Sequence, residues 1–127
     1  MFLATTNKPK RLLYLSYFER VSPAEVKRGR EEVTSLLADL LADFRLLADL
    51  SRLESMDVAC APEIGKLMEL CAQKGVGTLV RVIPDPRKDI GLNILSLFHY
   101  GPRVHAITCQ TMTEAAELLS LSEPVCE

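Results

Sequence analysis

Short apolar runs alternate with amphipathic stretches along the whole chain. Four runs rich in aromatic and branched residues predict strands at residues 11–18, 44–50, 77–83 and 103–110. Pro84 and Pro86 stop the third strand because proline cannot donate to a sheet ladder.

Helix patterns separate these strands. Ser22, Pro23 and Glu25 form a helix start, with an N-cap, a proline in the first turn and an acidic residue three positions after the cap. A second helix carries an apolar stripe from Ile64 to Cys71, and Gly75 lies where a helix commonly ends. Residues 89–101 predict a short third helix.

A last helix begins with a capping box made by Thr111 and Glu114. The resulting order is βαβαβαβα, which favours an α/β fold with a mixed, partly parallel sheet of four to five strands and about four helices. The length suits one domain over residues 11–121, with residues 1–10 as a flexible N-terminal segment and 122–127 as a C-terminal tail.

Charge and apolar content exclude several classes of protein. Fifteen basic residues against 17 acidic ones give a net charge of −2, so the basic excess that nucleic-acid binding requires is missing. Aspartates interrupt the leucine-rich runs before they reach membrane-spanning length, and the first ten residues lack the basic start and the long apolar stretch of a signal peptide. We therefore expect a cytoplasmic protein that does not insert into membranes.

The residues suggest no catalytic or metal chemistry. Four cysteines lie far apart without a C-x-x-C pair, so we expect reduced thiols rather than a zinc site or disulfides. His99 and His105 fall on different predicted elements, and the common nucleophile and phosphate-binding motifs are absent. Asp49 and Asp57 could meet as paired carboxylates, but capping and turn roles are favoured. We expect that the protein binds no cofactor and is not an enzyme.

The stretch "LLADLSRLESMDVACAPEIGKLMELCAQKGVGTLVRVI" resembles the STAS domain of anti-sigma factor antagonists and sulfate transporter tails. That family has a strand ending in Asp-Leu-Ser, a short turn, an aspartate opening a helix and a glycine before the next strand. The resemblance spans residues 11–121 and includes "VHAITCQTMTEAAELL" as the closing strand and helix. The matching positions are Asp49, Leu50, Ser51, Leu53, Met56, Asp57 and Gly75.

The chain departs from that family at the phosphoryl acceptor. In the antagonists a serine or threonine follows the helix-opening aspartate, whereas Val58, Ala59 and Cys60 follow Asp57 here. Pro62 is harmless only in the first turn of a helix, so the helix cap is expected at or after Ala59. Asp57 is then expected in the entering loop or an irregular first turn, where its carboxylate binds backbone amides.

The resemblance implies a non-enzymatic protein-interaction module in bacterial cytosolic signalling, with an anti-sigma factor or serine kinase as partner. The alternative is a sensor that binds a small ligand such as a nucleotide or lipid. Asp49 and Ser51 are expected to close the turn after their strand. Ser51 and Ser55 are the candidates for an alternative phosphorylation site, although the absence of a phosphorylation switch is favoured. The candidate partner-binding residues are Asp49, Ser51, Ser55, Asp57, Val58, Ala59 and Cys60.

The predicted third helix has more apolar residues than one buried face can hold. Burial in the core and exposure at a homodimer or partner interface are both consistent with this pattern. The candidate interface residues are Ile90, Leu92, Ile94, Leu97 and Phe98.

Overall fold

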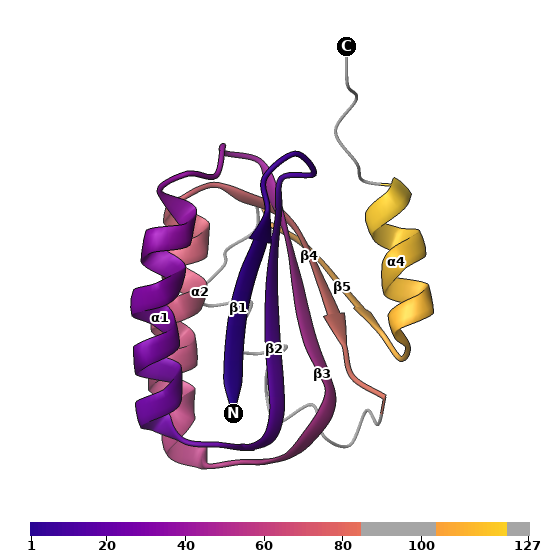
Figure 1. The fold of residues 1–127 in the computed structure, drawn as a ribbon. Helices are drawn as coiled ribbons and strands as arrows, with labels where there is room; N and C mark the ends of the chain where they lie inside the picture. Colours follow the sequence, from indigo (N-terminus) through magenta and orange to yellow (C-terminus); the bar gives the residue numbers. More distant parts are fainter. Residues whose placement is uncertain (85–103, 122–127) are drawn as a thin grey trace.

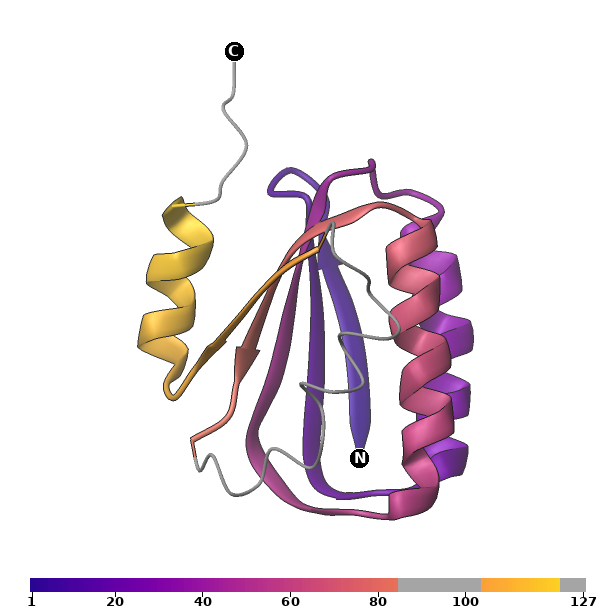
Figure 2. The same cartoon turned by 180° about the vertical axis from the view of Figure 1, so that it is seen from behind.

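A computed structural model describes residues 1–84 and 104–121 as a five-stranded sheet with helices on both faces (Figure 1). Helices α1 and α2 cover one face, and α4 lies on the other, as the reverse view also shows (Figure 2). The elements are β1 (Phe2–Asn7), β2 (Leu12–Val21), α1 (Pro23–Leu37), β3 (Phe44–Met56), the 3-10 turn η1 (Val58–Cys60), α2 (Ala61–Gln73), β4 (Val76–Val82), β5 (His105–Cys109) and α4 (Met112–Leu121).

The sheet is mixed, and its strands follow one another in chain order. Strands β2 to β5 are parallel neighbours, and β1 pairs antiparallel with β2. Helix α1 connects β2 to β3, and α2 connects β3 to β4, as parallel pairing requires. The prediction of an α/β fold with a partly parallel sheet is therefore confirmed. The predicted helix at 89–101 and its five candidate interface residues lie outside the described residues.

Strand β1 corrects the expectation that residues 1–10 lie outside the domain. Phe2 packs edge-on against Tyr17 of β2, with ring centroids 4.9 Å apart. Phe2 is buried, but Ala4 and Thr6 are only half-buried and Leu3 is exposed. The β1 sequence has one buried aromatic residue and two threonines. It therefore lacks the strong alternation of apolar and polar residues by which a strand is recognised.

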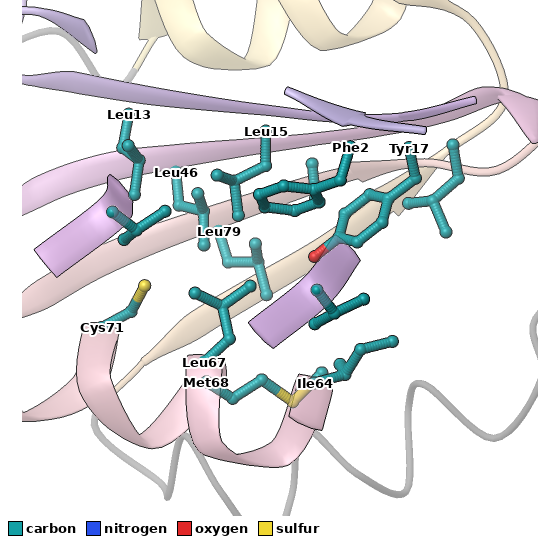
Figure 3. Close-up of a cluster of buried hydrophobic side chains, with 14 of the residues drawn as sticks. Phe2, Leu13, Leu15, Tyr17, Leu46, Ile64, Leu67, Met68, Cys71 and Leu79 are labelled. Atoms are coloured by element: carbon teal, nitrogen blue, oxygen red, sulfur yellow. The ribbon is translucent and has the colours of Figure 1, made fainter. Parts of the chain in front are cut away.

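The main core fills the space between the sheet and the two helices α1 and α2 (Figure 3). Alternate residues of β3, including Phe44 and Leu46, point into it, because successive strand side chains face opposite sides. The other face of β3 carries Leu47 into a smaller core under α4. Arg45 on that face is also buried, and its guanidinium donates to the carbonyl oxygens of Leu119 and Lys10. These bonds tie α4 and the turn before β2 to the sheet.

Helix ends follow the predicted signals. The backbone N–H of Glu25 donates to Ser22 Oγ at 3.3 Å, and that of Glu114 donates to Thr111 Oγ1 at 3.1 Å. Gly75 follows α2 with a φ of 94°, a conformation that glycine adopts without steric cost. Among the helices in residues 1–84 and 104–121, none is long and apolar enough to cross a membrane.

Candidate functional site

The candidate site begins where β3 ends and the chain turns into α2. Asp57 is the N-cap of η1, and its Oδ1 accepts a hydrogen bond from the N–H of Ala59 at 2.9 Å. The Asp57 carbonyl oxygen accepts from the N–H of Cys60, also at 2.9 Å. Helix α2 then starts at Ala61 with Pro62 in its first turn. The expected irregular first turn and the amide-binding role of Asp57 are both confirmed.

The turn displays an apolar side chain to solvent. Val58 is 80 % exposed, the largest value among the exposed large hydrophobic residues in the described part of the chain. Ala59 beside it is exposed, whereas Cys60 is fully buried and its thiol contacts the Val21 carbonyl oxygen. The buried cysteine and the Asp57 cap together fix the turn, so Val58 is presented by ordered backbone.

The end of β2 lies directly beside this turn. Arg20 is the sheet neighbour of Ser55, and both are exposed. The pairing of β2 with β3 is irregular here, with register shifts between Ser16 and Phe18 and between Glu19 and Arg20, and Glu19 has a φ of 57°. This contribution was not predicted because the apolar pattern of the strand ends at residue 18. Apolar Val21 after two charged residues was the signal for a longer strand.

We define the η1 surface as five exposed residues from the end of β2, the end of β3 and the following turn. They are Arg20, Ser55, Asp57, Val58 and Ala59. The surface combines one exposed aliphatic group with one cation, one carboxylate and one hydroxyl. This mixture suits contact with another protein, where an apolar centre is surrounded by polar groups.

Asp49 and Ser51 do not belong to this surface, which corrects the expectation that they close a turn. Strand β3 continues to Met56, so both residues lie within the strand. Asp49 is 6 % exposed, and its carboxylate accepts from the Tyr14 hydroxyl at 3.0 Å and the Ser51 N–H at 2.9 Å. Seven strand residues, at about 3.3 Å each, separate Asp49 from Asp57, so the two carboxylates cannot form a pair.

The electrostatics of the site disfavour nucleophilic chemistry. Burial raises the pKa of the Cys60 thiol, and the nearby Asp57 carboxylate raises that pKa further. The thiol therefore stays protonated at neutral pH, whereas a catalytic cysteine needs a lowered pKa. Within residues 1–84 and 104–121, no cluster of three or more histidine, cysteine or acidic side chains could hold a metal ion.

A partly open cavity between the sheet and α2 is too small for a nucleotide or a lipid. Its volume is about 30 Å³, with Leu15, Met68 and Arg81 among its lining residues. That is room for about one water molecule, whereas small-molecule sites usually measure about 300–1,000 Å³. The residues that line this cavity therefore give no support to a nucleotide or lipid sensor.

Solved structures with the same arrangement of elements are known. An uncharacterised protein from Shewanella loihica with a SpoIIAA-like fold superposes with a TM-score of 0.68 and 13% identity, covering 94% of this chain and 92% of that chain. The Bacillus cell fate determinant SpoIIAA in its phosphorylated form gives a TM-score of 0.61 at 12% identity, covering 93% and 99%. The chain has the SpoIIAA-like fold.

An anti-sigma factor antagonist from Mycobacterium paratuberculosis also superposes on this chain, with a TM-score of 0.58 and 16% identity. The superposition covers 94% of this chain and 93% of that chain. The STAS-type fold expected from the sequence is thus confirmed. Neither the protein-family models nor the curated proteins include a match to this chain. At these identities the likeness concerns the fold alone.

Proposed function

We propose that this chain is a non-enzymatic, STAS-type regulatory module that binds a partner protein through the η1 surface. The exposure of Val58 on a fixed turn is the observation that carries the proposal. An exposed aliphatic side chain gains free energy when a partner covers it, and an ordered turn loses little conformational entropy on binding.

The SpoIIAA-like fold supports the choice of partner class. Proteins with this fold include anti-sigma factor antagonists, so an anti-sigma factor or a related serine kinase is the partner class we propose. Val58, Ala59 and Cys60 carry no hydroxyl group, so a phosphate cannot be placed on these three residues by such a kinase. Binding is then constitutive, or it is controlled by something other than phosphorylation of the turn.

A pull-down with two matched variants tests this proposal. Val58→Asp places a charge on the η1 surface, and Leu41→Asp places the same charge at another exposed hydrophobic residue, which is 64 % exposed and lies between α1 and β3. Both variants should keep the parent's melting temperature because neither side chain is buried. We expect the parent and Leu41→Asp to retain the same partner protein, and Val58→Asp to lose it. Retention by Val58→Asp would contradict the proposal.

A further inference from the structure

Among residues 1–84 and 104–121, strand β1 forms one edge of the sheet and pairs only with β2. The Phe18 N–H donates to the Met1 carbonyl oxygen, so these two residues form a hydrogen-bonded antiparallel pair. Hydrogen-bonded and non-hydrogen-bonded pairs alternate along an antiparallel ladder, and the β1–β2 register has no shift. The backbone groups of Leu3 and Thr5 are therefore also hydrogen-bonded to β2. The N–H and C=O groups of the intervening residues point away from β2, toward the free edge; these residues are Phe2, Ala4 and Thr6.

The β1 strand itself, in the part of the chain that the structure describes, lacks the usual protection against further pairing. Exposed edge strands commonly carry a charge, a proline or a bulge that prevents another strand from adding. The β1 sequence "FLATTN" has no charged residue and no proline, and its pairing with β2 is regular over all six residues. The edge is therefore competent to accept a sixth strand.

A groove runs along the same edge, between β1 and α1, with a volume of about 660 Å³. Phe2 is among the residues that line its β1 side, and Arg28, Glu31 and Glu32 are among the α1 residues that line the other side. Two carboxylates against one guanidinium leave this wall with an excess of negative charge. Glu25, also in the groove, is already paired with the amino group of Met1 at 2.9 Å.

We propose that the β1 edge is a second docking site, which accepts an extended segment of a partner protein with alternating basic and apolar residues. The segment adds to β1 through main-chain hydrogen bonds at Phe2, Ala4 and Thr6, a known mode of peptide recognition. Its basic side chains point toward Glu31 and Glu32, and its apolar side chains lie on the opposite face beside Leu3, which is 52 % exposed. A second copy of this chain fits less well, because pairing two β1 edges would bring the acidic walls of two α1 helices together.

The test uses two synthetic peptides that differ only in charge, VKVKVKV and VEVEVEV, with both ends blocked. Amide chemical shifts of the labelled full chain report where each peptide binds. We expect the lysine peptide to shift the β1 amides and to bind about tenfold or more tightly than the glutamate peptide. Equal binding of the two peptides, or shifts that exclude β1, would overturn the proposal.

Two variants separate the main-chain contribution from the charge contribution. Ala4→Pro removes an N–H that points away from β2 and leaves the hydrogen bonds to β2 intact, so binding of the lysine peptide should be lost. Ala4→Val keeps this N–H and should still bind the lysine peptide. The double variant Glu31→Lys and Glu32→Lys changes only exposed residues and should reverse the preference in favour of the glutamate peptide. An unchanged preference would contradict the role of the acidic wall. If the chain forms a dimer without peptide and Ala4→Pro dissociates that dimer, the β1 edge binds a second copy of the chain instead.

These experiments do not involve the residues of the η1 surface. The β1 edge proposal can therefore fail while the partner-binding role of Val58 stands, and the reverse also holds.

Discussion

The hydroxyl of Tyr14 on β2 donates to the buried carboxylate of Asp49 on β3 across a distance of 3.0 Å. The second carboxylate oxygen of Asp49 accepts from the Ser51 N–H two residues along the same strand. A buried carboxylate requires such partners because its transfer out of water is costly. Asp49 therefore acts as a link between the two strands rather than as part of the η1 surface.

Removing the Tyr14 hydroxyl should weaken the sheet. We expect Tyr14→Phe to lower the free energy of unfolding by about 1–2 kcal/mol, because one oxygen of the buried carboxylate loses its donor. Urea unfolding measures the change. Thr5→Val on β1, at an exposed position opposite Tyr14, is the matched control and should stay within about 0.5 kcal/mol of the parent. An equal effect of both variants would show that the hydrogen bond contributes nothing specific.

Gly29 allows α1 to approach β1. A methyl group added at Gly29 would lie 2.1 Å from two ring carbons of Phe2, so the aromatic ring would have to move within a packed core. We expect Gly29→Ala to destabilise the domain by about 1–3 kcal/mol, although alanine favours helix. Thermal or urea unfolding tests this. In a Phe2→Leu background the same substitution should cost much less, and an unchanged cost would place the strain elsewhere.

Alkaline pH should destabilise the domain through buried acids. Burial raises the pKa of the Cys71 thiol to about 12 from an ordinary value near 9. The folded state thus keeps a proton that the unfolded state has lost, so this contribution is complete below pH 9 and disappears as pH rises toward 12. Cys71 alone should remove about 1.4 kcal/mol for each pH unit within that window. Urea melts at pH 8 and pH 10 measure the loss, and Cys71→Ala should reduce the slope. A slope unaffected by this substitution would contradict the assignment.

Patterns with local physical causes were predictable from the sequence. Ser22, Thr111 and Gly75 mark helix ends through hydrogen bonds and backbone conformation that depend only on nearby residues. Pro62 located the start of α2 for the same reason, since its ring is compatible only with the first turn. The parallel sheet then followed from the alternation of strands and helices.

Features that depend on distant contacts were not predictable. Strand β1 is held by Phe2 packing on Tyr17 and Gly29, which lie 15 and 27 residues further along the chain. The length of β3 was underestimated because mostly polar residues follow Leu50. Pairing with the end of β2 carries the strand on to Met56. The contribution of Arg20 to the η1 surface depends on an irregular register that the sequence does not reveal.

The Asp57 carboxylate should have a modest structural role. We expect Asp57→Ala to lower the free energy of unfolding by about 1 kcal/mol, because the N–H of Ala59 loses its acceptor. Asp57→Asn keeps an oxygen at the same position and should recover most of the loss. Urea melts of both variants measure it. An Asp57→Ala variant with parental stability and no partner binding would make the aspartate a recognition residue only.

Phosphorylation should not occur at the turn. Incubation with ATP and an anti-sigma-type serine kinase, followed by mass spectrometry, should find no phosphate on Val58, Ala59 or Cys60, since none has a hydroxyl. Ser55 lies exposed on the same surface and is the position to inspect first, whereas Ser51 is half-buried within β3. Stoichiometric phosphate on Ser55 would show that control by phosphorylation acts from a neighbouring residue.

Site-specific photo-crosslinking in the native host tests the central claim most directly. A photoreactive amino acid placed at position 58 probes the η1 surface, and the same amino acid at position 41 probes another exposed hydrophobic position. We predict a discrete crosslinked product with one partner protein from position 58 and none from position 41. No product from position 58, or the same product from both positions, would contradict partner binding through the η1 surface.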